Sequence, residues 1–172
     1  ETAEIAIKLA NTGHLTFSTL HTNDAPSAVS RLYKMGIEPF LIAYAINLIV
    51  AQRLVRKLCT KCKKRVINFD EALMAAAELN IADWRNYTIY QAAGCEECNG
   101  TGYKGRIAIH EALYFTKELR QLIVKSGGDV DEESLRLQAR KDGSQNLSEA
   151  GLEKVKMGLT SIEEVLAGTS DS

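Results

Sequence analysis

The chain has 172 residues, enough for one domain or for one domain with a small insert, and its 45% hydrophobic and 25% charged residues are ordinary for a globular protein. The formal net charge of -1 excludes a strong overall attraction to nucleic acid or to an anionic membrane. No apolar run approaches about 18 residues and no signal-like segment opens the chain, so we expect a soluble, cytosolic protein.

The first residues predict an amphipathic helix. Small and apolar side chains recur at helical spacing, at Ala3, Ala6, Ile7 and Ala10. Glu4 and Lys8 form an outward i,i+4 pair, and Gly13 is expected to end the helix. Because Glu1 is not a methionine and the strand that should precede such a helix is missing, we expect the chain to be a piece of a longer protein.

The stretch from Thr12 to Pro26 predicts a buried strand and then a capped helix. Residues 15–20 are largely uncharged on both faces, which is typical of a strand covered on both sides. His21 follows the carboxyl end of this strand, where ligands bind in open α/β sheets, so it is a candidate for meeting a phosphate or a reacting water. A hydrogen bond to a loop carbonyl is the simpler alternative for a lone histidine. Asp24 is expected to cap the helix, with Pro26 in its first turn.

The following segments predict two helices and a strand. Residues 27–35 form an amphipathic pattern that ends before Gly36, and residues 40–47 predict a mostly buried helix. Residues 49–58 alternate as a strand, on which Arg53 lies.

All four cysteines of the chain fall in two Cys-x2-Cys pairs separated by 32 residues: Cys59, Cys62, Cys95 and Cys98. Two such pairs in a cytosolic chain favour a tetrahedral zinc site, because each pair can place both sulfurs about 2.3 Å from one ion. Four thiolates leave no position open for a substrate, so the site is expected to be structural. The alternatives are four unrelated thiols or a redox pair, and neither pair opens a helix in the setting that a thioredoxin-type pair requires.

The segment between the two pairs is rich in alanine and predicts a helical insert. Asn68 or Asp70 is expected to cap it, and Trp84 and Tyr87 are expected to pack on it. Residues 94–105 form a glycine-rich knuckle whose small residues permit tight turns around a metal.

The remainder predicts a strand over 106–114 and helices over 117–125, 132–141, 148–157 and 162–167. Capping boxes are possible at Thr160 with Glu163 and at Ser161 with Glu164. Glu111 and Asp142 are lone acids, which we interpret as ion-pair or cap residues.

A basic stretch runs from Arg53 to Arg65, where seven of thirteen residues are Lys or Arg and none is acidic. Zinc with four thiolates carries a charge of about -2, which gives these cations a local partner, and no aromatic residue interleaves with them in the sequence. We therefore expect no nucleic-acid binding; an acidic partner, an anionic membrane surface and a merely solvated face remain open. The sequence also contains no Gly-x4-Gly-Lys-Ser/Thr loop, so the chain alone is not expected to hold a nucleoside triphosphate.

The segments TGHLTFSTLHTNDAP, AQRLVRKLCTKC, GCEECNGTGYKGRIAIHE and GLEKVKMGLTSIEEVL occur in this order. Together they resemble the secretion ATPase superfamily and, more narrowly, the C-terminal part of its type II secretion and type IV pilus assembly ATPases. The paired cysteines separate this branch from the pilus retraction ATPases, which lack them. The resemblance implies an α/β fold that forms the C-terminal portion of a RecA-like P-loop ATPase domain, with Walker A and Walker B upstream. It implies core residues 1–58, a four-Cys zinc module at 59–105, and a closing strand with a C-terminal helical bundle at 106–172.

The same resemblance implies roles for individual residues. His21 matches the histidine that approaches the γ-phosphate and is the expected catalytic residue, and His14 matches the first histidine of the same box. Thr19 and Thr22 would shape the nucleotide-facing loop, and Arg53 is a weaker candidate for an interprotomer or core polar contact. ATP and Mg2+ would bind the longer protein, whereas the isolated chain should not hydrolyse ATP.

The resemblance further implies a homo-hexamer at the inner face of the bacterial cytoplasmic membrane, acting on an inner-membrane platform protein that the basic stretch would face. It leaves pilus assembly and type II secretion open, and we lean toward pilus assembly. Two alternatives remain: a chaperone-type zinc module, which CEECNGTG matches in a single copy, and a zinc-ribbon nucleic-acid binder with salt-dependent affinity.

Overall fold

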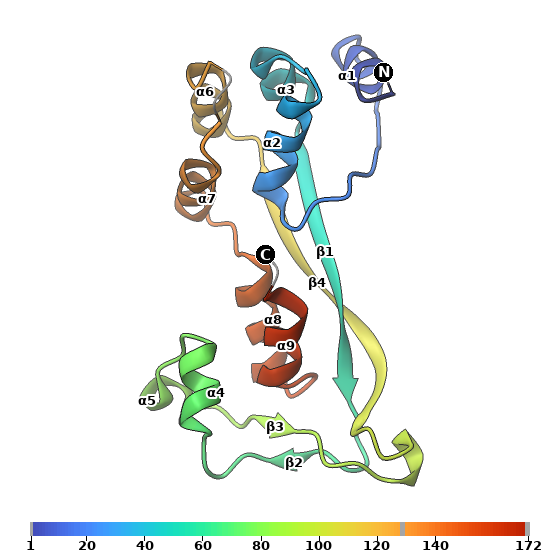
Figure 1. The fold of residues 1–172 in the computed structure, drawn as a ribbon, viewed down its shortest axis with the longest axis vertical. Helices are drawn as coiled ribbons and strands as arrows, with labels where there is room; N and C mark the ends of the chain where they lie inside the picture. Colours follow the sequence, from blue (N-terminus) through green and yellow to red (C-terminus); the bar gives the residue numbers. More distant parts are fainter. Residues whose placement is uncertain (1, 128–129, 171–172) are drawn as a thin grey trace. The chain divides into compact units, whose positions relative to one another are not determined.

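A computed structural model describes residues 2–127 and 130–170. The chain forms two compact units and passes between them more than once. Unit 1 comprises Glu1–Ala51 and Glu111–Asn146, and unit 2 comprises Gln52–His110 and Leu147–Ser172. The paired strands β1 (Leu48–Leu58) and β4 (Tyr103–Tyr114) each contribute residues to both units (Figure 1). Each unit is described by itself below.

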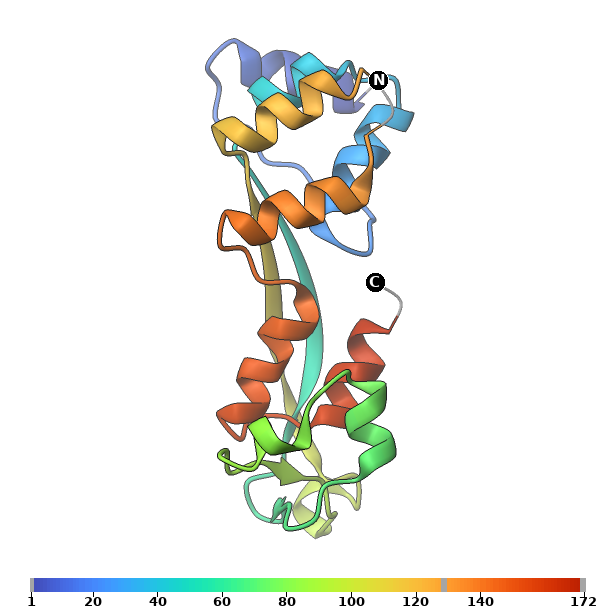
Figure 2. The same cartoon turned by 90° about the vertical axis from the view of Figure 1, so that its left-hand side faces the viewer.

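Unit 1 is built from five helices among its described residues. They are α1 (Thr2–Asn11), α2 (Ala25–Lys34), α3 (Pro39–Ala45), α6 (Lys117–Lys125) and α7 (Glu132–Lys141). Helix α3 lies beside α6 (Figure 2). The bounds of α6 and α7 agree with the sequence-based expectation, since both helices begin after a capping side chain, Thr116 and Asp131.

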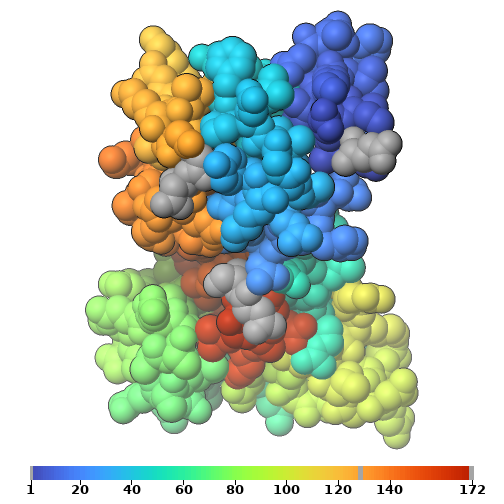
Figure 3. All heavy atoms as spheres, turned by 45° about the horizontal axis from the view of Figure 1, so that its top comes forward, coloured from blue at the N-terminus to red at the C-terminus, as the bar shows by residue number. Residues whose placement is uncertain are grey.

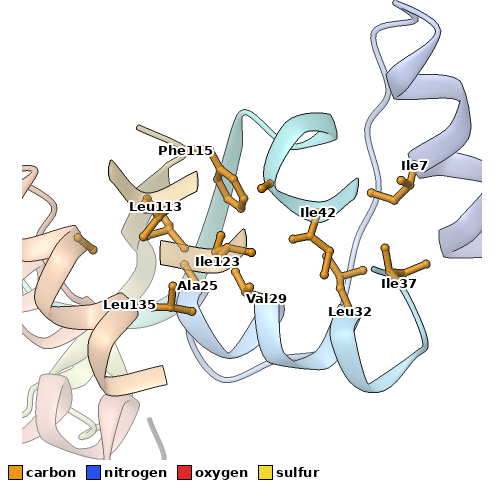
Figure 4. Close-up of a cluster of buried hydrophobic side chains, with 13 residues drawn as sticks. Ile7, Ala25, Val29, Leu32, Ile37, Ile42, Leu113, Phe115, Ile123 and Leu135 are labelled. Carbon is orange, nitrogen blue, oxygen red and sulfur yellow. The ribbon is translucent and has the colours of Figure 1, made fainter. Parts of the chain in front are cut away.

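The core of unit 1 gathers apolar side chains from every one of these helices and from the end of β4. Figure 4 shows Val29 of α2, Ile42 of α3 and Ile123 of α6 converging, with Leu135 of α7 at the edge of the cluster. Ile42, Ile123 and Leu135 are fully buried. Burial of these apolar side chains stabilises short helices that would be only marginally stable in isolation.

The expected strand at residues 15–20 is wrong. Residues 14–23, which we call the His21 loop, form neither helix nor strand, and the side chains of Leu15 and Phe17 are each 86% exposed. A strand covered on both faces needs neighbouring strands to pair with, and within the described residues the strand pairs are only β1 with β4 and β2 with β3. The local alternation is present in the sequence, but none of the strands among the described residues pairs with it.

Unit 2 contains the residues between the cysteine pairs. Helices α4 (Glu71–Ala76) and α5 (Ile81–Trp84) replace the single expected helical insert, and they are separated by a turn in which Glu78 has a φ of 56°. Asp70, rather than Asn68, caps α4 by accepting hydrogen bonds from the backbone of Ala72 and Leu73. Two short strands not expected from the sequence, β2 (Lys64–Arg65) and β3 (Tyr90–Gln91), pair antiparallel.

The insert shares its core with the end of the chain. Met74 and Trp84 are buried together with Val155 of α8 (Leu147–Lys156) and Val165 of α9 (Ile162–Thr169). Trp84 packs in this core as expected, whereas Tyr87 is 44% exposed and packs on the Trp84 ring at a centroid distance of 5.8 Å. The insert is therefore stabilised by helices that begin more than fifty residues after it in the sequence.

Two capping boxes were expected before α9, and the structure assigns these residues otherwise. Ser161 is the N-cap and accepts from the backbone of Glu164, whereas the hydroxyl of Thr160 donates to the carbonyl of Arg56 at 2.8 Å. The carboxylate of Glu164 accepts from the backbone, Nε and Nη2 of Arg56, at 2.8, 2.8 and 2.5 Å, and so does not complete a box. Because Glu164 is 9% exposed, this ion pair ties α9 firmly to β1.

Candidate metal centre

The four cysteines converge at one end of the β1 and β4 strands. Their sulfur atoms lie within 4.8 Å of one another, and the pairs Cys59–Cys95, Cys62–Cys98 and Cys95–Cys98 are separated by 3.9, 3.8 and 3.8 Å. Four zinc–sulfur bonds of 2.3 Å in a tetrahedron require sulfur–sulfur distances of about 3.8 Å. The cysteines are not joined in disulfides, and these three distances match those around one tetrahedral ion.

Two backbone knuckles create this arrangement. Cys59 follows the last residue of β1, and its N–H donates to the carbonyl of Gly102 at 2.9 Å, which ties the first knuckle to the second. A short 3-10 helix, Glu96–Cys98, forms the second knuckle, and the sulfur of Cys98 accepts from the backbone N–H of Cys95 and Gly102 at 3.2 and 3.1 Å. These bonds hold the sulfur in place and orient it, as outer partners of a metal ligand do.

The sulfurs differ in their electrostatic surroundings. Burial raises the pKa of the Cys62 thiol to about 11, and hydrogen bonds with the other three cysteines act in the same direction. Burial also acts to raise the pKa of Cys98, but the hydrogen bonds from Cys95 and Gly102 outweigh it and lower that pKa to about 6. The second knuckle thus stabilises a thiolate, which is the form that binds a metal.

The basic stretch is only partly available to a partner. Arg56 pairs with Glu164 and lies over the ring of Tyr103 at 4.2 Å. Lys63 donates to the carbonyl of Gly158 at 2.8 Å and lies 4.3 Å from the centre of the Tyr90 ring. Aromatic rings do therefore accompany these cations, but they come from distant parts of the sequence and were not visible within the stretch. Lys61 and Lys64 are exposed.

The other candidate residues lie mostly on the His21 loop of unit 1. His21 and Thr19 are exposed, and within residues 2–127 and 130–170 neither side chain makes a hydrogen bond or ion pair. Thr22 donates to the carbonyl of Asp24 at 3.2 Å, and Nδ1 of His14 lies 3.0 Å from the hydroxyl of Thr12. Arg53 is half-buried on β1, in unit 2.

Sequence reasoning missed the partner of Asp24. Asp24 was expected only as a helix cap, which it is, but it also accepts hydrogen bonds from Arg136 of α7. The apolar residues that follow Asp24 at helical spacing were the available sign that this end of the helix is buried. A buried carboxylate needs a cation as its partner.

With this geometry established, the chain can be compared with known protein families. The sequence profile of the family described as "Type II/IV secretion system protein" matches residues 1–167. The chain belongs to this family. No helix of this family member, within the residues described, has the length and apolar character needed to cross a membrane.

Several curated relatives match nearly the whole chain. It is 46% identical to the "Type IV pilus assembly ATPase PilB" of Myxococcus xanthus, over 99% of this chain and 30% of that protein. It is 47% identical to the protein of the same name from Thermus thermophilus, over 98% of this chain and 19% of that protein. The "Type II secretion system protein E" of Aeromonas hydrophila is 41% identical, over 99% of this chain and 33% of that protein. The chain thus spans a third or less of these relatives.

Proposed function

We propose that this chain is the C-terminal part of a hexameric P-loop ATPase that powers type IV pilus assembly or, as the second candidate, type II secretion. The observation that carries the proposal is identity of 46 and 47% over nearly all of the chain to proteins named as pilus assembly ATPases. We favour pilus assembly because, among these relatives, the two at 46 and 47% identity carry that name, although other relatives named for pilus assembly are 40 to 43% identical and those named for type II secretion are 41 to 43% identical. The RecA-like core, the ring at the inner face of the cytoplasmic membrane and the platform-protein partner belong to this proposal.

The four cysteines are proposed to hold a structural Zn2+. The fit of their sulfur spacing to a tetrahedron supports this ion, and four protein ligands leave none of its positions open for substrate. The bound ion would join the loop after β1 to the loop before β4. Its contribution would be to the stability of unit 2 and not to the chemistry of hydrolysis.

His21 is proposed to act on the terminal phosphate of ATP, with Mg2+ and ATP held by the longer protein. An imidazole N–H is a suitable donor to charge that develops on phosphoryl oxygens in the transition state. The exposed position of His21 on a loop without regular structure is compatible with a group that meets a ligand held elsewhere. His14, Thr19 and Thr22 would shape this loop, and Arg53 would make an interprotomer or core polar contact.

The test joins the chain to its natural upstream sequence and compares the ATPase rate of the wild type with that of His21→Ala at equal zinc content. We expect kcat to fall by about 10²-fold or more while nucleotide affinity is retained, since loss of one donor to transition-state charge has effects of that size.

His110→Ala is the matched control, because His110 is also an exposed histidine but bonds to Gln52 at 3.0 Å on the strands of unit 2. Its ATPase rate should stay at the wild-type value. Absence of ATP hydrolysis in the wild-type longer protein would refute the proposed function. Equal rates for His21→Ala and wild type would refute the role of His21 alone.

A further inference from the structure

The His21 loop has few internal supports. At its start, the backbone N–H of His14 donates to the carbonyl of Leu9, the last such bond to α1. Between that point and Asp24, the loop has no helical or strand hydrogen-bond ladder, and most of its side chains are exposed. Within the loop, the hydroxyl of Thr16 donates to the carbonyl of His14 at 3.2 Å, and the secondary structure that lies next to His21 in the sequence is α2, which the loop enters at its far end.

Asp24 is the fixed point at that end. It is 5% exposed, and its Oδ1 accepts from the backbone N–H of Ser27 at 2.8 Å. Its backbone carbonyl accepts from the hydroxyl of Thr22, the residue that follows His21. A displacement of Asp24 would thus be passed to the loop through one side-chain bond as well as through the backbone.

Arg136 holds Asp24 from a distant part of the sequence. Its Nη2 and Nε donate to Oδ2 of Asp24 at 2.5 and 3.2 Å, across 112 positions in the chain. Glu132 and Glu133, on the same helix as Arg136, lie 3.4 and 4.0 Å from its guanidinium group and orient it. Although burial acts to raise the pKa of Asp24, the bonds from Ser27 and Arg136 outweigh it and lower that pKa, so the carboxylate is charged.

The helix that carries Arg136 is itself firmly placed within unit 1. Leu135, next to Arg136 in the sequence, is fully buried in the core, and Ala139 one turn later is 8% exposed. After the helix ends, Asp142 accepts from the hydroxyl of Thr116 at 2.7 Å. The surfaces of α2 and α7 adjoin in the space-filling view (Figure 3). Helix α7 can therefore serve as a rigid support for Asp24.

We propose that Arg136 is a positioning residue for the His21 loop, acting through the buried carboxylate of Asp24. The catalytic consequence rests on the proposed function, in which His21 meets the terminal phosphate. The structural consequence does not: without the guanidinium group, the carboxylate loses its charged partner and the Thr22–Asp24 bond loses its support. Arg136 thus acts on the loop from α7 without touching the nucleotide.

The first measurement follows the methyl signal of Thr22 by NMR in the longer protein labelled at its threonine methyl groups. Arg136→Ala should shift or broaden this signal, and Arg136→Lys, which keeps the charge but not the two-pronged contact, should do so less. Lys141→Ala is the matched control, because it removes a cation from an exposed position on the same helix. The melting temperature of each variant shows whether it folds. If Arg136→Ala does not fold, Arg136→Lys serves as the test variant in its place.

The second measurement is a double-mutant cycle on the ATPase rate. Arg136→Ala should lower kcat about 10-fold with KM for ATP little changed, and in a His21→Ala background it should have little further effect. If the Asp24–Arg136 ion pair only held α2 to α7, Arg136→Ala would instead reduce kcat by the same factor in both backgrounds.

The proposal is overturned if the Thr22 signal is unmoved by Arg136→Ala or if the two kcat losses multiply. If the wild-type longer protein hydrolyses no ATP, the proposed function fails, and the Thr22 signal alone then decides whether Arg136 positions the loop.

Discussion

Glycines around the second knuckle show how single residues position the clustered cysteines. Gly102 has a φ of +77°, and a Cβ built on it would lie 2.6 Å from the Cβ of Ala92. Gly94 has a φ of +99°, and its Cβ would lie 2.5 Å from the carbonyl oxygen of Gly100. Both positions therefore require glycine for two reasons: the positive φ, and the lack of space for a Cβ.

Replacing Gly102 by alanine should destabilise the chain and weaken metal binding. Gly105→Ala is the control, because Gly105 has a φ of +80° but no atom within 4 Å of a built Cβ, so it carries the backbone strain without the clash. We expect Gly102→Ala to lower the free energy of unfolding by about 1–3 kcal/mol more than Gly105→Ala does. Denaturant unfolding and zinc content per chain would measure this, and equal losses in the two variants would contradict it.

Asp24 should make stability depend on pH. Because the pKa of Asp24 is lowered in the folded chain, its contribution is full above the unfolded value, about 4, and is lost as the pH falls through the lower folded value. Asp24→Asn retains an oxygen that can cap α2 but loses the charge that pairs with Arg136. The stability difference between wild type and Asp24→Asn should be largest near neutral pH and should shrink below about pH 4.

Unfolding in denaturant at a series of pH values between about 7 and about 3 would measure the difference. Since loss of any bound metal at low pH would affect both chains alike, the comparison isolates the carboxylate. A difference that stayed constant over the series would argue against a charged Asp24–Arg136 pair.

At the scale of elements, the approach of α8 to α9 depends on one small residue. Gly151 is buried within α8, and a Cβ built there would lie 2.5 Å from Cγ1 of Val165 on α9. Glycine inside a helix ordinarily costs about 1 kcal/mol relative to alanine. Its presence here allows the two helices to pack closely beneath the insert.

Gly151→Ala should therefore destabilise the chain despite the better helix propensity of alanine. We expect a net loss of about 1 kcal/mol, because overpacking by one methyl group in a rigid contact exceeds the gain in propensity. In a Val165→Ala background the space is vacant, so the same substitution should cost little or nothing. Thermal unfolding of the four chains measures this cycle, and a cost that persisted in the Val165→Ala background would refute the contact as its cause.

At the scale of the whole molecule, the cysteines and the shared core of the insert belong to unit 2 alone. Cys59 to Cys98, the insert and helices α8 and α9 all lie in that unit, whereas the core around Ile42 and Leu135 lies in unit 1. A bound metal should consequently stabilise unit 2 more than unit 1.

Removal of the metal with a chelator, or Cys95→Ser, should reduce stability by several kcal/mol, on the order expected for a structural zinc site, and mainly in unit 2. Amide hydrogen exchange should rise in β1 after Gln52, in α4 and in α8, while α3 and α6 keep their protection. Exchange that rises equally in both units, or that ignores chelation, would contradict a structural metal confined to unit 2.

Much of the local structure and the clustering of the four cysteines could be predicted from the sequence. Two Cys-x2-Cys pairs predicted that the four sulfurs gather at one site, as they do. The predicted cap at Asp24 is confirmed, and of the two candidates Asn68 and Asp70 the structure selects Asp70. These features are readable because each depends on residues a few positions apart, where backbone geometry alone fixes the relation. The ordered motifs also predicted the family, which the comparison confirms. The three-part division at 58 and 105, and the roles on the His21 loop, stay predictions.

Tertiary structure decided what joins distant residues. The alternation at residues 15–20 predicted a strand, but a strand exists only where a partner strand supplies its hydrogen bonds. Glu164 was expected to close a capping box, yet its carboxylate pairs with Arg56 across 108 positions. Likewise, Arg136 reaches Asp24 across 112 positions. Local sequence specifies which groups need partners, whereas the fold of the whole chain determines which partners come within reach.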